Sequence, residues 1–395
     1  MKYNHSFSAA NILLPKQDFT KWATIACDQY TSEPEYWDQV KIAAGNNPSA
    51  LNIVLPEVYL SNDNSKRIET INKNMQEYLD SDIFVEYPDS LIFVERIQSD
   101  GKCRRGIVGK IDLESYDYRA GTTAEIRATE QTVLSRIPPR VEIRKNAPLE
   151  LPHVMLLFDD AKDDIFSYLV ENKNRFDKVY DFELMCNAGS ITGYLLDDKA
   201  KNTVLSMLET LKQQNEGFLF CVGDGNHSLA TAKECYNLNK TEASKYALTE
   251  IVNIHDTALQ FEPIYRVVFG IDPETLIDEF VKTVGEGKQK FTCVYGNTVR
   301  EIGVNPTAKL AVGTLQAFLD DYVKKCNGAE IDYIHGEASL KKLASRENAI
   351  GFIFEGMKKS ELFEAVNADG SLPRKTFSMG HADDKRFYIE ARKIK

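Results

Sequence analysis

Paired cysteines, long apolar runs and dense basic segments are all missing from this chain of 395 residues. Its seven cysteines are scattered and never take the Cys-x-x-Cys spacing of zinc or redox sites. We therefore interpret them as free thiols, most of which fill the core as small apolar side chains. No stretch approaches the roughly 18 apolar residues needed to cross a bilayer, and the opening segment MKYNHSFSAANILLPK lacks a signal-peptide pattern. The sequence thus predicts a cytoplasmic protein without a membrane partner.

The charge balance argues against nucleic acid as a partner. Basic residues number 48 and acidic residues 59, which leaves a net charge of −11. No Lys/Arg run is present that would release counterions from a nucleic-acid backbone. A small anion remains compatible with this charge, because a phosphate needs only a few local N–H groups and one or two cations. Internal repeats are also absent, which excludes solenoids and propellers.

Short apolar runs alternate with segments of helical period, and this alternation predicts an α/β fold, with a mixed α+β arrangement as the alternative. The expected strands cover 91–94, 105–108, 154–158, 218–222, 251–254, 266–269 and 350–354. Helices with a 3.6-residue apolar stripe are expected over 68–79, 204–211, 276–284 and 315–323.

The length exceeds what one hydrophobic core usually holds, so two or three units are expected. Prolines at 138, 139, 148 and 152 predict an extended connector, because each disfavours helix at the residue before it. A second break is expected near Gly270 to Pro273. We therefore expect an N-terminal α/β unit over 1–145, a core unit over 146–270 and a C-terminal α/β unit over 271–395.

The strongest local signal is an apolar strand, 218–222, that runs into a glycine-containing turn and then a helix. The turn residues are Gly223, Asp224, Gly225, Asn226, His227 and Ser228. Glycines permit positive φ and close approach of a ligand, and a helix N-terminus offers unpaired N–H groups to an anion. Asp224 could hold Mg²⁺, and His227 could bond a phosphate oxygen or carry a proton. The alternative is that Asp224 or Ser228 only caps the helix.

A second cluster runs from Arg119 to Thr132 and continues to Arg136, Arg140 and Arg144. Its hydroxyls and guanidinium groups suit a planar anion, and a solvated charged helix face is the alternative.

Two further segments also carry candidate site residues. The segment CDQYTSEPEYW, residues 27–37, suits a substrate or base pocket, although capping by Ser32 with Pro34 in the first turn explains much of it. The pair His255 and Asp256 at a strand end invites a catalytic interpretation, against a purely structural role.

Several ordered segments together resemble the domain-of-unknown-function 1015 family. They are CDQYTSEPEYW, RATEQTVLSRIPPRVEIRKNAPLELPHVMLLFDD, FCVGDGNHSLATAKE, LQFEPIYRVVFG and LPRKTF. The Asp-Gly-x-His segment also resembles the motif of the ParB/sulfiredoxin-like superfamily, which includes CTP-binding partition proteins, ATP-using sulfiredoxins and a free serine kinase. This resemblance implies a ParB/sulfiredoxin-like core with additional α/β segments, and nucleotide phosphates held at the helix N-terminus.

The resemblance also implies roles for single residues. Glu130 becomes the general base, and Asp224, Asn226 and His227 would lie beside the transferred phosphoryl group. Arg266 and Lys375 match family positions that could reach a phosphate. The chain departs from the family at Asn226 and Ser228, where relatives often have His and Arg, and at Tyr265, where relatives often have His. Loss of that arginine removes a cation from the transition state unless Lys233, Arg266 or an arginine from 119–144 compensates.

The sequence thus predicts a nucleotide-dependent phosphotransferase that acts on a small hydroxylated metabolite, with serine or phosphoserine as the first candidate. The expected cofactors are ATP or ADP and Mg²⁺, with Asp224 as the metal ligand. The rival from another class is a nucleotide-binding regulatory module without sustained turnover. A metal-dependent hydrolase that uses Asp224, His227, His255 and Asp256 is the third possibility.

Overall fold

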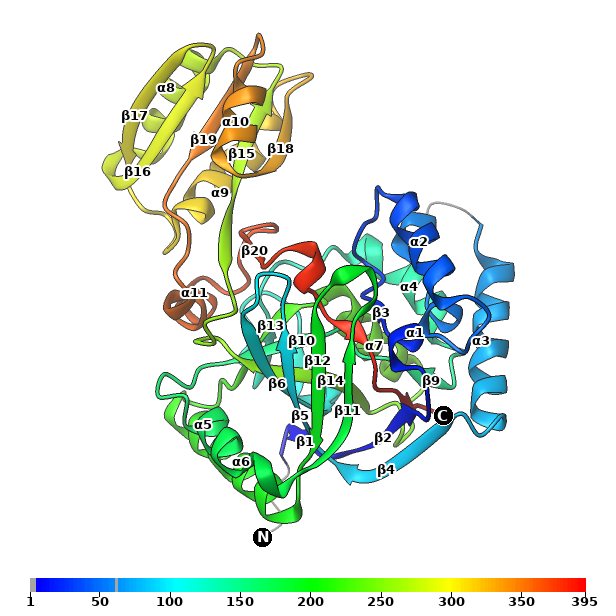
Figure 1. Cartoon of the computed structure of the whole chain (residues 1–395). Coiled ribbons are helices and arrows are strands. Elements are labelled where there is room, and N and C mark those ends of the chain that lie inside the picture. Colours follow the sequence, from blue (N-terminus) through cyan, green and yellow to red (C-terminus); the bar gives the residue numbers. More distant parts are fainter. Residues whose placement is uncertain (1–4, 61–62) are drawn as a thin grey trace. The chain divides into compact units, whose positions relative to one another are not determined.

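The computed structural model of the protein describes residues 5–60 and 63–395, and Figure 1 labels its elements. The first four residues of the opening segment considered above therefore lie outside the described residues. The chain divides into a first unit, Met1–Leu259 with His381–Lys395, and a second unit, Gln260–Gly380. None of the helices in the described part has both the length and the apolar character that a bilayer-spanning helix needs.

The first unit is built on a ten-stranded mixed sheet. In spatial order its strands are β11 (Asp177–Glu183), β12 (Ser190–Leu195), β5 (Ile92–Ile97), β6 (Cys103–Asp112), β14 (Tyr246–Asn253), β10 (Met155–Phe158), β13 (Phe220–Asp224), β8 (Ile126–Ala128) and β7 (Tyr116–Asp117), and β1 (Phe7–Ser8) pairs with β6. Strand β10 is parallel to β14, and β8 is parallel to both β13 and β7, whereas the other pairs are antiparallel. Parallel pairing brings the carboxyl ends of β8 and β13 to the same edge.

Helices cover both faces of this sheet because its central strands are apolar on both sides. In β5, Ile92 and Val94 belong to one core, and Phe93 between them belongs to the other. The first core includes side chains of α1 (Phe19–Trp22), α2 (Pro34–Ala44) and α3 (Ser65–Asp80). The second includes side chains of α5 (Asp164–Asn172), α6 (Asp198–Gln214) and α7 (Asn226–Leu238). The α/β prediction is therefore confirmed, with a sheet of mixed direction.

The C-terminal segment returns to the first unit and is held there by short strands and buried charge. Strand β21 (Phe387–Tyr388) pairs with β3 (Thr24–Ile25), and β22 (Arg392–Lys393) pairs with β9 (Leu149–Glu150). A further two-stranded sheet of this unit is formed by β2 (Ala10–Pro15) and β4 (Phe84–Ser90). The buried Arg386 donates to Glu250 and to Glu390, each over 2.5 Å. These contacts fix residues 381–388 beside the turn that follows β13, where Lys385 pairs with Asp224.

The second unit has its own six-stranded sheet. It contains β17 (Thr298–Val304), β16 (Glu286–Tyr295), β19 (Ala349–Ile353), β15 (Phe261–Phe269) and β18 (Glu330–His335) in that order, with β20 (Phe377–Met379) paired to β15. Its helices are α8 (Pro273–Val284), α9 (Ala311–Val323), α10 (Glu337–Ala344) and α11 (Leu362–Asp369). Every strand and helix that the sequence predicted has a counterpart in one of the two units, with boundaries shifted by a few residues.

The division of the chain differs from the three units expected. Residues 1–145 and 146–259 form one unit because β6 pairs with β14, which places strands from both segments in the same sheet. The prolines of 137–144 do not form an extended connector. They lie in the first turn of α4 (Ile137–Arg144), where the missing proline N–H would have no helical partner in any case.

Candidate functional site

The turn between β13 and α7 requires glycine at one position. Gly225 has φ of 81°, and a Cβ atom there would lie 3.1 Å from the Cα and from a methyl carbon of Val154. The amide of Gly225 donates to Asp224 Oδ1 over 3.0 Å. Helix α7 starts at the next residue, and no side chain of the described residues caps it. Its first-turn amides therefore lack a side-chain acceptor, and their binding of an anion stays a prediction.

Two acceptor oxygens at this turn are buried without a hydrogen bond. They are Asp224 Oδ2 and Asn226 Oδ1, which have no hydrogen-bond partner among the described residues. Lys385 Nζ lies 3.4 Å from Asp224 Oδ2, close enough for an ion pair. An unsatisfied buried acceptor costs roughly 1–3 kcal/mol, so native proteins rarely keep one without a reason. Both are oxygen atoms of the type that Mg²⁺ prefers as ligands, and both can accept a hydrogen bond from a water bound to the ion.

His227 is held in its neutral form by its surroundings. The pKa of this imidazole is lowered from 6.5 to about 4, mainly by burial and also by the charges of Arg140 and Arg136, against an opposing effect of Asp28. Its Nε2 accepts a hydrogen bond from the backbone N–H of Val133 over 3.3 Å. The ring proton of the neutral form therefore resides on Nδ1. At neutral pH His227 offers a neutral donor rather than the positive charge of an imidazolium ion.

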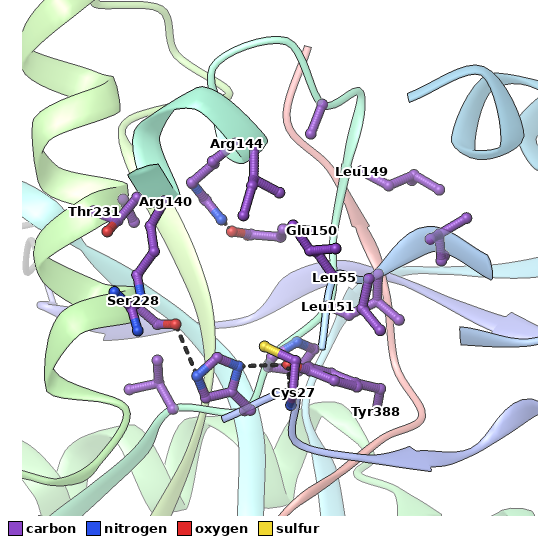
Figure 2. Close-up of a pocket in the computed structure, with 18 of the residues that line it drawn as sticks. Cys27, Leu55, Arg140, Arg144, Leu149, Glu150, Leu151, Ser228, Thr231 and Tyr388 are labelled. Carbon is purple, nitrogen blue, oxygen red and sulfur yellow. Dashed lines mark hydrogen bonds and ion pairs between the residues drawn. The ribbon is translucent and has the colours of Figure 1, made fainter. Parts of the chain in front are cut away.

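Ser228 belongs to a chain of polar contacts that the sequence did not reveal. Its Oγ lies 2.7 Å from Nε2 of the buried His153, and His153 Nδ1 lies 2.8 Å from the hydroxyl of Tyr388. Figure 2 shows Ser228 and Tyr388 on opposite sides of this ring, joined to it by dashed lines. The Tyr388 hydroxyl oxygen also accepts a hydrogen bond from the backbone N–H of Cys27. This chain links the turn to the segment after β3 and to the C-terminal return.

Asp28, in the segment that the sequence singled out as a candidate pocket wall, lies next to the same group. One of its oxygens is 3.9 Å from His153 Nε2. Burial by itself would raise the pKa of Asp28, but His153, the hydrogen bond from Gln29 and the charge of Lys385 lower it, and the net pKa is below its ordinary value. Asp28 is thus a second carboxylate in the electrostatic field of Lys385.

Glu130 follows β8 at the same sheet edge as the turn. Ala128 is the register partner of Val222, so Glu130 and Asp224 each come two residues after a paired position. The hydroxyl of Thr129 donates to the carbonyl of Val222, which ties the end of β8 to β13. The strand register therefore brings the predicted base to the edge that carries the predicted phosphate site.

A cavity of about 150 Å³ lies beside the first turns of α7. Its walls are mostly aliphatic side chains, and Ser228, His153 and Tyr388 also line it. Two arginines reach it already paired, Arg140 with Glu57 and Arg144 with Glu150, and Figure 2 shows Arg144 beside Glu150. Residues 223–227 do not line this cavity. The pocket therefore suits the apolar part of a ligand whose charged part is bound elsewhere.

Two other arginines of the predicted cluster also have partners. Arg119 bonds Asp117 at the surface, and Arg127 lies over the ring of Phe218, 3.9 Å from its centroid. Arg136 is exposed, and it and Arg140 act on the site through the pKa of His227. The segment 119–144 therefore does not gather its guanidinium groups around one ligand.

Arg266 and Lys375 belong to the second unit. Arg266 is fully buried and donates to Gln316 over 2.6 Å and to the carbonyls of Ile264 and Lys375 over 2.6 and 3.0 Å. Lys375 is exposed, with its Nζ 5.4 Å from the ring centroid of Tyr333. Within its own unit Arg266 organises backbone carbonyls, and a role of either residue in phosphate binding stays a prediction.

No group of three or more His, Cys, Asp or Glu side chains among the described residues could hold a metal ion. The residues of the hydrolase alternative have separate partners. His255 Nε2 lies 2.6 Å from Asp159 Oδ1. The carboxylate of Asp256 accepts a hydrogen bond from the backbone N–H of Arg105 over 3.1 Å. A metal bound by Asp224 would thus take most of its ligands from water and from a bound phosphate, which is common for Mg²⁺.

Three residues of the site escaped the sequence reasoning: His153, Lys385 and Tyr388. His153 precedes β10 after a proline, and the other two lie in a segment without any motif. Their proximity to the turn depends on pairing between segments more than 70 residues apart, as the Ser228–His153 separation of 75 shows. The available signals were weak, because His153 is a single polar residue between Pro152 and Val154, and KRFY follows directly on two aspartates.

The comparison with protein families assigns the chain over nearly its whole length. Residues 8–393 match the model of a family described as protein of unknown function, DUF1015. The chain belongs to the DUF1015 family. No curated protein matches it.

Among solved structures, the DUF1015 chain is similar to a variant of free serine kinase in complex with ADP, at 12% identity and a TM-score of 0.43 over 72% of this chain and 91% of that chain. It is also similar to a conserved hypothetical protein from Pyrococcus furiosus, at 13% identity and a TM-score of 0.38 over 72% and 94%. A third similar structure is SbnI with a C-terminal truncation from Staphylococcus aureus, at 10% identity and a TM-score of 0.38 over 69% and 82%.

Proposed function

We propose that the turn between β13 and α7 binds the phosphates of a nucleotide, and that the protein transfers a phosphoryl group to the hydroxyl of a small metabolite. The observation that carries this proposal is the uncapped N-terminus of α7 beside two buried oxygens without hydrogen bonds, Asp224 Oδ2 and Asn226 Oδ1. Such a turn has donors for an anion and acceptors for a cation at the same place. A nucleotide phosphate that carries Mg²⁺ satisfies both.

The donors come from the backbone and from one side chain. The amides of the first turn of α7 carry the positive end of the helix dipole, and Gly225 lets a phosphate approach them closely. Lys385 adds a cation 3.4 Å from Asp224. His227 contributes through its Nδ1–H as a neutral donor, since its pKa of about 4 leaves it uncharged at neutral pH. The aliphatic cavity beside Ser228 would hold the apolar part of the ligand.

Asp224 and Asn226 would hold the magnesium ion through their buried oxygens. When bound, the ion would neutralise charge on the phosphates. Glu130, at the same sheet edge, would accept the proton of the attacking hydroxyl. Positioning and electrostatics supply most of the rate in phosphoryl transfer, so no covalent role is needed from the protein. Serine is the first acceptor to test, because the motif resembles that of free serine kinase.

The test is formation of a phosphorylated metabolite. Purified protein is incubated with Mg²⁺, serine and ATP or ADP, and phosphoserine is measured by phosphorus NMR. Asp224→Asn and Glu130→Gln should each lower turnover by a factor of about 100 or more, because each removes a group from the reacting centre. Asp177→Asn and Glu183→Gln are matched controls at exposed positions of β11 and should leave the rate unchanged. Activity that persists in both site variants would rule out this mechanism.

A nucleotide-binding regulatory module is the second candidate. The neutral state of His227 favours a binding module, because it leaves Lys385 as the cation of the proposed phosphate site. Phosphotransferases usually gather several cations around the transferred phosphoryl group. Calorimetry separates the two functions. Tight nucleotide binding without product, weakened by Asp224→Asn, would support a binding module, whereas turnover that depends on an acceptor hydroxyl would support the enzyme.

A further inference from the structure

The cavity of about 150 Å³ beside α7 has an aliphatic wall and a polar corner. The aliphatic wall gathers side chains from α3, α4, β9, α7 and β14, among them Met75, Ile143, Leu149, Leu229 and Leu248. Figure 2 shows Ser228 and Thr231 on one side of the cavity and Leu149 and Leu151 on the other. An apolar cavity of this size can take up a molecule such as benzene, so the wall accommodates about six carbon atoms.

Each arginine and each carboxylate that lines the cavity is already paired. Arg140 forms an ion pair with Glu57, and Arg144 forms one with Glu150. The thiol of Cys27 is uncharged, because burial raises its pKa far above the ordinary value. A charged group of a ligand would therefore lose its hydration without gaining a free counter-ion from the described lining. The cavity walls thus favour a ligand whose body is uncharged.

The polar corner contains one proton more than its internal contacts use. Ser228, Tyr388 and the neutral form of His153 carry one exchangeable proton each. Two contacts join them, from Ser228 Oγ to His153 Nε2 over 2.7 Å and from His153 Nδ1 to the Tyr388 hydroxyl over 2.8 Å. If the ring proton is on Nε2, the hydroxyl proton of Ser228 is left over. If it is on Nδ1, the hydroxyl proton of Tyr388 is left over.

The two tautomers of His153 place the same demand on a ligand. With the proton on Nε2, Ser228 can donate one hydrogen bond and accept one more. With the proton on Nδ1, Ser228 donates to His153 and can only accept from a ligand. A hydroxyl group both donates and accepts, so it fits either tautomer, whereas a carbonyl oxygen fits only the first. The polar corner therefore matches an alcohol.

We propose that this cavity binds an uncharged alcohol with an aliphatic part of about six carbon atoms, and that this alcohol is the phosphoryl acceptor. The second half of the statement rests on the proposed function. Helix α7 begins at Asn226, so a hydroxyl held by Ser228 lies in the same helical turn as the proposed phosphate site. The ammonium and carboxylate of free serine would lack partners on these walls, which makes an aliphatic alcohol the better acceptor.

The binding test uses the full chain without nucleotide or Mg²⁺, and its probes are 1-butanol, 1-pentanol and 1-hexanol in NMR titrations. Affinity should rise by about fourfold with each methylene, because each one is transferred from water to the aliphatic wall. Hexanoate and hexylamine have the same chain with a charged end and should bind about tenfold or more weakly than 1-hexanol. Ser228→Ala should weaken 1-hexanol binding by about threefold to tenfold through loss of one hydrogen bond.

A filled cavity supplies the matched pair of variants. Ala232→Met places an unbranched side chain of a good helix former in the cavity and should lower 1-hexanol affinity by about tenfold or more. Ala43→Met, at an exposed position of α2, should bind like the wild type. If Ala232→Met does not fold, the chain-length and charge series on the native protein still decides.

Phosphoryl transfer is then measured with Mg²⁺ and ATP or ADP, with 1-hexanol and serine in competition. Binding of 1-hexanol without transfer to any acceptor would refute the proposed function and leave the binding site standing. Preferred transfer to serine would overturn the acceptor assignment and leave the proposed function standing. The binding site itself is overturned if the three alcohols bind equally or not at all, if a charged probe binds as tightly as 1-hexanol, or if a folded Ala232→Met binds like the wild type.

Discussion

Replacing His227 with glutamine should remove a pH dependence of stability that the burial of this imidazole creates. The pKa falls from 6.5 to about 4 on folding, mainly through burial and further through Arg140 and Arg136. Between these two values the unfolded chain binds a proton that the folded chain does not, so the free energy of unfolding decreases as the pH falls. This loss of unfolding free energy is absent above pH 6.5 and becomes complete at about pH 4.

The magnitude follows from the two pKa values. One pKa unit corresponds to about 1.4 kcal/mol, so the difference sets an upper limit of about 3 kcal/mol. The imidazole is only partly buried, and solvent screening reduces the expected effect to about 1–2 kcal/mol. Carboxylates also titrate in this range, but they are shared by the wild type and the variant. The difference between the two proteins therefore isolates His227.

The assay is urea unfolding of the wild type and His227→Gln at a series of pH values between about 4 and 7. As the pH falls from about 7 to about 4, the difference in unfolding free energy between the two proteins should shift by about 1–2 kcal/mol in favour of the variant. His381→Gln, at an exposed position, controls for the loss of an imidazole as such. A stability difference that is constant with pH, or that shifts in favour of the wild type as the pH falls, would refute the reasoning.

The remaining predictions concern the scaffold of the site. Gly225→Ala should destabilise the protein by about 1–3 kcal/mol in urea unfolding, because the residue has a positive φ and its new methyl would meet Val154. Arg386→Ala should cost about 3–5 kcal/mol, because it removes the cation of the buried Glu390 and the nearer of the two cations of the buried Glu250, which keeps Arg104 at 3.8 Å. The exposed Lys393→Ala should cost at most about 1 kcal/mol. Ser228→Ala should cost about 1 kcal/mol through loss of the contact to His153. Stability equal to the wild type in the first two variants would contradict these assignments.

Local pattern allowed the elements and the turn to be predicted. The apolar run 218–222 and the glycines after it were sufficient to place a strand, a tight turn and a helix start, and the structure has β13, Gly225 and α7 there. These features depend on neighbours in the sequence, through side-chain period and the φ angles that only glycine adopts freely. Pro138 and Pro139 misled the prediction because proline is compatible both with an extended segment and with the first turn of a helix.

The sequence by itself determined the α/β character, the expected strands and helices, and the glycine-containing turn at which a helix begins. Only the tertiary structure decided that 1–259 and 381–395 form one unit, and that His153, Lys385 and Tyr388 surround the motif. The reason is physical: backbone preferences act over a few residues, whereas strand pairing and burial of charge bring together side chains that no local pattern connects.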